Sequence, residues 1–272
     1  MLVSIRANSS LPVTIVSNNY PSKEWHLMPD TLVQIKDEDC FTDGRLDPAK
    51  AKLSLWKYSD YEETIYLDVD GCLLKELDFE FKYFTTHVNG YLSKDDEVSD
   101  INLWVKPEIL YRKYGIPETN KLPGTNSSFM AWDKKGIDVF KRALRNYENP
   151  VSLGSLTYQW GKSKCQPDEL YLNVALAQLG YQPEPLNVLF TRRRNAKGGY
   201  VGLTYIQQNF YVLCCWGGLE FNAFEISGSG NIRSGLYNLL MTKNFEKVIG
   251  ANTFYDHFYA LITKKIYAKG IS

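Results

Sequence analysis

The stretch TIYLDVDGCLLKELD, from Thr64 to Asp78, places two carboxylates where an apolar run ends. Asp68 and Asp70 are separated by one residue, and a glycine follows them. At the end of a parallel strand, both would point into the crevice where open α/β sheets bind ligands. Two such close anions repel each other unless a cation joins them, and a hard divalent metal also binds phosphate oxygens. The alternative is a solvated turn, because Asp and Gly are common turn residues.

The chain before this stretch predicts strands and a helix in alternation. A strand is expected in Leu11–Asn19, a second in Thr31–Ile35 and a third in Glu63–Leu67. Between the last two, Leu46–Ser59 has the apolar spacing of an amphipathic helix, with Asp47 as its N-cap and a proline at its first position. Strand, helix and strand in this order favour a parallel sheet covered by helices.

The rest of the chain predicts further strands and helices, and we expect an α/β fold. We assign residues 1–200 to a ligand-binding core and residues 201–272 to strands and helices that complete the same domain. Strands are expected at Ser127–Trp132, Leu186–Thr191, Tyr200–Tyr205 and Phe210–Trp216, and helices at Asp133–Tyr147, Pro167–Gly180, Ser234–Val248 and Thr253–Lys265.

Composition narrows the function classes. The 31 basic and 31 acidic residues cancel, so no overall field attracts the chain to nucleic acid or membrane. The five cysteines are odd in number and show no Cys-X-X-Cys spacing, which is typical of reduced thiols in a cytoplasmic protein. The opening residues lack the features of a secretory signal, and no apolar run reaches the ~20 residues of a transmembrane helix.

Two enzyme classes fit the aspartate pair. The string YLDVDGCLL resembles the first motif of haloacid-dehalogenase phosphatases, in which Asp68 would be the nucleophile and Asp70 the general acid and base. Such enzymes also carry a late acidic pair, and the sequence after Leu186 has none of that type. The motif usually opens the domain, whereas about 60 residues precede it here.

Three separate segments, the first of which contains the aspartate pair, together resemble GT-A-fold glycosyltransferases, in particular the glycogenin-like family 8 group and its phage and bacterial relatives. The first segment, residues 47–74, resembles the helix, turn, strand and Asp-X-Asp of that group. NSSFMAWDKKGIDVF (126–140) is similar to its Asn-Ser/Ala-Gly strand and the following helix, and QPDELYLNVAL (166–176) to its Asp-Gln-Asp-x-x-Asn helix start. The resemblance implies a Rossmann-like mixed sheet with helices on both faces.

The resemblance also implies a metal-dependent sugar transfer that retains the anomer. Asp68 and Asp70 would bind Mn²⁺ or Mg²⁺ and, through the metal, the diphosphate of a nucleotide sugar, with a UDP-sugar preferred. His257 is the only late histidine and would be a third ligand, although its helical pattern favours a helix residue. Lys52 is similar to the basic residue that these enzymes direct at the donor; a surface lysine is the alternative.

Four more positions follow from the resemblance. Asn126 and Ser127 would contact hydroxyls of the donor sugar. Asp168 and Glu169 would do the same from the start of their helix, or support the reacting face. The alternative for these two acids is simple helix N-terminal charge, which contributes about 0.3–1 kcal/mol.

Two features depart from the family or extend it. The first predicted strand follows MLVSIRANSS directly, so the family's base-binding N-terminal strand is expected to be absent. A further alternative is therefore a GT-A-like protein that binds a carbohydrate or a partner without catalysis. TRRRNAKGG, Thr191–Gly199, is a basic cluster that would suit an anionic acceptor such as DNA. A solvated loop is its commoner explanation, and the balanced charge argues against nucleic-acid binding. The acceptor and any oligomer stay open.

Overall fold

The computed structural model describes nine segments and one isolated residue of the chain. They are residue 5, residues 8–18, 29–68, 71–73, 75–78, 82–96, 105–151, 167–186, 188–191 and 212–215. Several predictions fall outside them: the strand at 200–205, the helices at 234–248 and 253–265, Asp70, His257 and most of the basic cluster.

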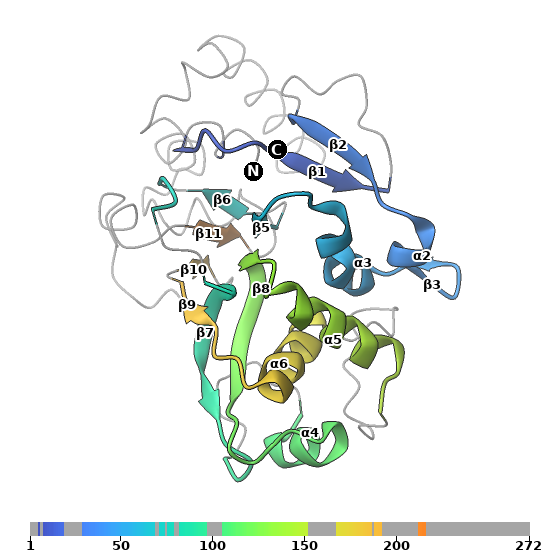
Figure 1. Cartoon of the computed structure of the whole chain (residues 1–272), viewed down its shortest axis with the longest axis vertical. Helices are drawn as coiled ribbons and strands as arrows, with labels where there is room; N and C mark the ends of the chain where they lie inside the picture. Colours follow the sequence, from blue (N-terminus) through green and yellow to red (C-terminus); the bar gives the residue numbers. More distant parts are fainter. Residues whose placement is uncertain are drawn as a thin grey trace, which may run out of the picture.

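A four-stranded mixed sheet forms the centre of the described structure (Figure 1). Its order is β5 (Glu63–Leu67), β8 (Leu122–Asp133), β7 (Phe84–Leu92) and β9 (Glu184–Pro185). Strand β8 is antiparallel to both of its neighbours, whereas β7 and β9 are parallel. The expectation of a parallel sheet is therefore wrong for β5, because its partner among the described strands, β8, returns in the opposite direction.

Smaller sheets accompany the central one. Their pairings join short strands that the sequence only partly predicted. They are β1 (Thr14–Ser17) parallel to β2 (Thr31–Gln34), β10 (Val188–Thr191) parallel to β11 (Val212–Cys215), β11 antiparallel to β6 (Gly71–Leu73), and the hairpin of β3 (Phe41–Thr42) with β4 (Arg45–Leu46).

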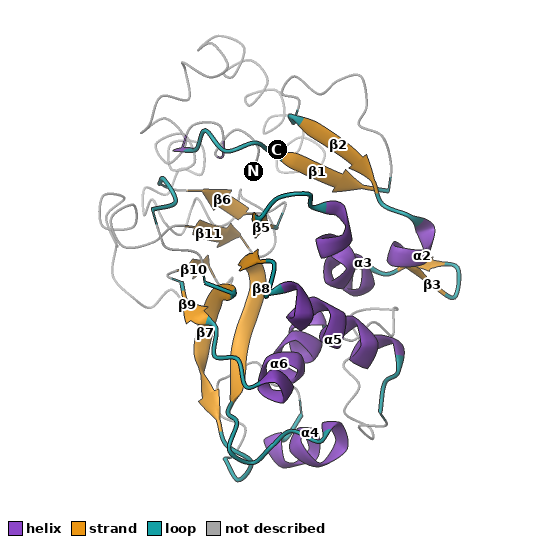
Figure 2. Cartoon of the chain, in the orientation of Figure 1, coloured by secondary structure: helices purple, strands orange, loops and turns teal. Residues whose placement is uncertain are grey.

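The helices are shown in purple in Figure 2. They are α2 (Asp37–Cys40), α3 (Pro48–Ser54) followed by the 3₁₀ turn η1 (Leu55–Tyr58), α4 (Pro107–Tyr114), α5 (Ile137–Glu148) and α6 (Asp168–Leu179). The local signals explain several boundaries. Asp47 accepts a hydrogen bond from the Lys50 backbone N–H at the start of α3, and Gly180 takes the left-handed conformation after α6. No helix among the described residues is long and apolar enough to cross a membrane.

Helix α6 forms the middle of the core. All eight residues from Leu170 to Ala177 are buried, so this helix has no solvent face along its centre. It packs against both β8 and α5. Aromatic contacts continue the core: the Phe140 ring lies 4.7 Å from that of Trp132 and 5.7 Å from that of Phe84. This packing fixes the start of α6 beside the sheet.

The sequence predicted the positions of most of these elements, with two instructive differences. Helix α5 begins at Ile137 rather than Asp133, because the Asp133 carboxylate accepts hydrogen bonds from the backbone N–H groups of Lys135 and Gly136 and makes a turn there. A Cβ atom at Gly136 would lie 1.9 Å from the Tyr83 carbonyl oxygen, so this turn requires glycine. Strand β8 begins five residues before the predicted strand at Ser127.

Candidate active site

Five of the predicted site residues meet in one cluster, although they come from four separate segments. Lys52 lies on α3, Asp68 directly follows β5, Ser127 is in β8, and Asp168 and Glu169 open α6. We call these five residues the Lys52 cluster. Proline at position 167 precedes the two acids, so they occupy the first turn of α6, where the helix dipole favours negative charge.

The Lys52 ammonium is the centre of this cluster. It lies 3.0 Å from Asp68 Oδ1 and 3.2 Å from Asp68 Oδ2, and it donates to the Ser127 hydroxyl oxygen at 3.1 Å. Asp168 Oδ2 lies 3.5 Å away. Only 16% of the Lys52 side chain is exposed, so these contacts are shielded from water more than those of a surface ion pair. The surface-lysine alternative is wrong.

Tyr66 belongs to the same site but was not singled out in the sequence. It precedes Asp68 by two residues, so the two side chains share a face of the strand. Its hydroxyl donates to Asp68 Oδ1, and the Lys52 ammonium lies 5.4 Å from the centre of its ring. Burial raises the pKa of Tyr66 well above its usual value; Lys52 opposes this effect and Asp68 reinforces it. The hydroxyl therefore stays protonated and fixes the orientation of Asp68.

Burial and the neighbouring charges together set the protonation states of Lys52 and Glu169. Burial lowers the pKa of Lys52, but the negative charges around it, led by Asp168, outweigh burial and hold that pKa well above its usual value. Burial and the neighbouring Asp168 raise the pKa of Glu169 to about 7, while Lys52 and a hydrogen bond with Ser127 oppose them. Lys52 is therefore cationic at neutral pH, whereas Glu169 holds its proton more tightly than an ordinary carboxyl group.

The charge balance of the cluster fits a bound cation. Three carboxyl groups, those of Asp68, Asp168 and Glu169, face a single ammonium. Asp168 Oδ2 is buried and accepts no hydrogen bond within the described part of the chain. Those residues contain no group of three metal-ligating side chains, but Asp70 and His257, two of the three predicted ligands, lie outside them.

Asn126, predicted to bind the donor sugar, lies next to the cluster and is 4% exposed. Its side-chain oxygen accepts a hydrogen bond from the Ser128 backbone N–H at 2.9 Å. This contact occupies the amide oxygen within its own strand. The Asn126 side chain therefore shapes the backbone around Ser127, whatever else it binds.

Asn173 is a second polar residue that the sequence did not single out. It is fully buried on α6, and its side-chain oxygen accepts from both the backbone N–H and the hydroxyl of Thr125, at 3.1 and 2.5 Å. Its side-chain nitrogen is buried without a hydrogen-bond partner among the described residues. Since Thr125 precedes Asn126 in β8, Asn173 joins the middle of α6 to the strand that carries Ser127. The available signal was the Asn of the helix-start motif that residues 166–176 resemble, because Asn173 is the only Asn in that segment.

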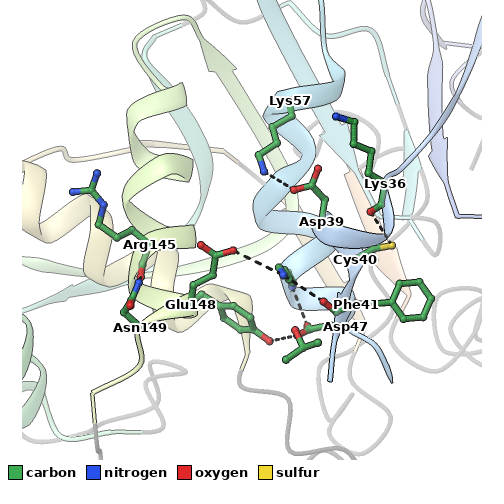
Figure 3. Close-up of polar contacts among 12 residues, drawn as sticks. Lys36, Asp39, Cys40, Phe41, Asp47, Lys57, Arg145, Glu148 and Asn149 are labelled. Carbon is green, nitrogen blue, oxygen red and sulfur yellow. Dashed lines mark hydrogen bonds and ion pairs between the residues drawn. The ribbon is translucent and has the colours of Figure 1, made fainter. Parts of the chain in front are cut away.

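A separate polar cluster anchors the helix that carries Lys52 (Figure 3). The Asp47 carboxylate accepts from the Thr42 hydroxyl at 2.7 Å and from the Tyr147 hydroxyl at 2.5 Å, besides capping α3. The Lys50 ammonium lies 3.9 Å from Glu148 at the end of α5. These contacts tie α3 to α5 and so hold Lys52 in place.

Asp39 is the other acid in Figure 3, and it joins α2 to η1. The Lys57 ammonium donates to one of its oxygens and the Tyr58 hydroxyl to the other. Burial raises the pKa of Asp39, but the hydrogen bonds from Lys57 and Tyr58 outweigh burial and hold that pKa below its usual range. Both Asp39 oxygens have protein partners, which indicates a structural role.

Comparison with known proteins gives matches only at the level of structure. No protein-family model matches the chain, and no curated protein sequence does.

The chain is similar to the galactosyltransferase LgtC in complex with donor and acceptor sugar analogues: the identity is 15%, the TM-score is 0.42, and 79% of this chain and 76% of LgtC are covered. An active-site mutant of LgtC matches at 16% identity and a TM-score of 0.43, with the same coverage. The apo structure of the bifunctional glycosyltransferase WbbM matches at 11% identity and a TM-score of 0.46, over 81% of this chain and 41% of WbbM. All three are structures of glycosyltransferases.

Proposed function

We propose that the chain is a glycosyltransferase that moves a sugar from a nucleoside-diphosphate donor, preferably a UDP-sugar, to an acceptor. The observation that supports this most is the Lys52 cluster itself. The three sequence motifs that resemble GT-A glycosyltransferases lie far apart in the chain, yet each supplies a side chain to this one cluster. A solvated turn after β5 would not need a buried lysine to neutralise it.

The charges of the cluster support a donor that carries a diphosphate together with a metal. A diphosphate alone would be repelled by three carboxyl groups and one ammonium, whereas a divalent cation removes the repulsion and binds both partners. Asp68 would hold Mn²⁺ or Mg²⁺, with Asp70 and His257 as predicted ligands in parts of the chain that the structure does not describe. When bound, the metal would stabilise negative charge on the departing diphosphate.

Each residue of the cluster then has a chemical role. Lys52 supplies a second, fixed positive charge beside the leaving group, and Tyr66 keeps Asp68 oriented. Asp168, together with Glu169 when it is ionised, would place negative charge near the anomeric carbon, which becomes positive as the sugar–phosphate bond breaks. Ser127 and Asn126 lie beside them and would contact hydroxyls of the donor sugar. By the resemblance, the product retains the anomeric configuration.

The test is slow hydrolysis of nucleotide sugars, because water can replace an unknown acceptor. With Mn²⁺ present, the wild type should release nucleoside diphosphate from one member of a panel of UDP-, GDP- and ADP-sugars. The Asp68→Asn variant should lose this activity, and the matched control Asp60→Asn, which changes an exposed carboxylate in the preceding loop, should retain it. No release and no nucleotide binding in the wild type would contradict the proposal.

The same assay separates the two remaining alternatives. Turnover of a generic phosphomonoester with Mg²⁺, lost in Asp68→Asn, would instead support a haloacid-dehalogenase-like phosphatase with Asp68 as nucleophile. Nucleotide or carbohydrate binding without turnover of either substrate would support the non-catalytic GT-A-like protein.

A further inference from the structure

Strand β8 carries an irregularity at the position of the Lys52 cluster. On one side of it, Thr86 of β7 lies opposite Met130, and the next residue, His87, lies opposite Asn126. Regular antiparallel pairing would place His87 opposite residue 129. Residues 127–129 are therefore extra on β8, and they form a bulge between the pairs Thr86–Met130 and His87–Asn126. Bulges of this kind re-aim side chains and are common next to active sites.

The Thr86 hydroxyl lies at the base of this bulge. It is 2.8 Å from the carbonyl oxygen of Asn126 and 2.8 Å from that of Phe129, and Thr86 is 1% exposed. The two carbonyl oxygens thus converge on one atom from opposite ends of the bulge. The site is closed to solvent, so the single hydroxyl proton is a buried donor that the two carbonyl oxygens share.

Two other contacts hold the middle of the bulge. The Asn126 side chain accepts from the Ser128 N–H, and the Asp68 N–H donates to the Ser128 carbonyl oxygen at 2.9 Å. The bulge is therefore joined to the Asp68 backbone directly. At its first residue, the Ser127 hydroxyl accepts from Lys52. Since that oxygen already accepts, its own proton is free for the hydrogen bond with Glu169.

We propose that Thr86 is a positioning residue for the Lys52 cluster: its hydroxyl holds the β8 bulge closed and so places Ser127 between Lys52 and Glu169. Thr86 itself contacts none of the charged side chains of the cluster in the described structure. Without its hydroxyl, the two carbonyl oxygens lose their shared donor and the bulge relaxes toward another register. Ser127 then leaves its place between the ammonium and the carboxyl group.

The neighbouring residue provides a matched control. Thr85 lies on the same strand, is 2% exposed, and has a hydroxyl that is buried without a hydrogen-bond partner among the described residues. Replacing either threonine by valine removes one buried hydroxyl and keeps the size and β-branching of the side chain. Only the change at position 86 removes a hydrogen bond from the bulge.

The experiment follows the ionisation of Glu169 in the ligand-free, metal-free protein. Carboxyl ¹³C NMR of protein labelled at glutamate gives the titration, and Glu169→Gln assigns its signal. The hydrogen bond with Ser127 lowers the pKa of Glu169, so its loss should raise that pKa. We expect an upward shift in Thr86→Val, the same shift in Ser127→Ala, no shift in Thr85→Val, and recovery of the wild-type titration in Thr86→Ser. A general loss of stability would not reproduce this pattern.

Two outcomes would overturn the proposal. The first is a pKa of Glu169 in Thr86→Val that equals the value in Thr85→Val, while Ser127→Ala raises the pKa of Glu169. If Thr86→Val does not fold, Thr86→Ala replaces it, and the second contradictory outcome is a Thr86→Ala titration identical to that of the wild type.

A binding arm rests on the proposed function. If the wild type binds UDP with Mn²⁺, the dissociation constant should rise roughly tenfold in Thr86→Val, as expected for one lost hydrogen bond in the site, and should not change in Thr85→Val. If the wild type binds no nucleotide, the proposed function fails, whereas the NMR titration still decides the role of Thr86.

Discussion

The Lys52 ammonium lies 3.0 Å from one carboxylate oxygen of Asp68 and 3.2 Å from the other, so a single side chain neutralises both oxygens. Because Asp168 lies 3.5 Å from the same ammonium, removal of Lys52 would leave two partly buried carboxylates without a counter-charge. The stability of the site and its protonation are therefore coupled through one residue.

Lys52→Met should destabilise the protein, because it leaves the carboxylates of Asp68 and Asp168 without their cationic partner. Near pH 8 we expect a loss of about 2 kcal/mol in the free energy of unfolding, less than for a fully buried pair because solvent reaches part of these side chains. Urea unfolding at pH 8 measures it. Lys134→Met, which removes the surface pair with Glu62, is the control and should cost about 0–1 kcal/mol. Equal effects of the two changes would contradict the prediction.

Asn173→Ala should destabilise the protein through the link between α6 and β8. It leaves two buried donors of Thr125 without an acceptor, which costs about 1–3 kcal/mol for each. Asn149→Ala is the control, because this exposed residue only donates to the Arg145 carbonyl oxygen at the end of α5 (Figure 3). Thermal unfolding compares the two variants. A melting temperature for Asn173→Ala as high as that of Asn149→Ala would show that the buried contact contributes nothing.

The sequence predicted the elements with strong local signals. The run Glu63–Leu67 agrees with β5 at both ends, and the Asp47 cap and Gly180 mark helix boundaries that the structure confirms. Strand β7 was missed, because FTTHVNGYL mixes polar and apolar residues without clean alternation. The Thr86 hydroxyl bonds to β8 and His87 Nδ1 lies 3.1 Å from the Leu186 carbonyl oxygen, so the burial of this strand depends on contacts that the local sequence does not encode.

Prediction of the site has the same limit, because long-range contacts are not visible in the local sequence. Lys52, Asp68, Ser127, Asp168 and Glu169 were predicted from motifs, and the structure brings them together. Tyr66, Thr86 and Asn173 were missed because each looks like an ordinary strand or helix residue. Thr86 and Asn173 matter because of hydrogen-bond partners that lie 40 and 48 residues away in the sequence, and no local periodicity reveals such partners.

Metal and nucleotide binding should be visible as thermal stabilisation. If Asp68 and Asp70 hold a metal, Mn²⁺ should raise the melting temperature of the wild type, and UDP should raise it further, because ligands that bind the native state stabilise it by about 2.7 kcal/mol at a hundred times the dissociation constant. Asp68→Ala and Asp70→Ala should not respond to either ligand, whereas Asp60→Ala should respond like the wild type. A wild-type response in Asp70→Ala would remove the basis for a metal at the aspartate pair.

Glu169 should make stability fall as the pH rises toward and through neutrality. Burial and Asp168 raise its pKa from the ordinary value of 4.5 to about 7 in the folded protein, so the folded state binds its proton more tightly than the unfolded state does. The resulting stabilisation is fully present below pH 4.5 and is lost as the pH passes through about 7. Glu169→Gln removes this titration, so the difference in melting temperature between variant and wild type should grow in favour of the variant from pH 5 to pH 8. Glu62→Gln, at a side chain that is 77% exposed, should show no such trend. Parallel pH profiles for Glu169→Gln and the wild type would mean that Glu169 is ionised throughout this range and that Lys52 compensates three carboxylates at once.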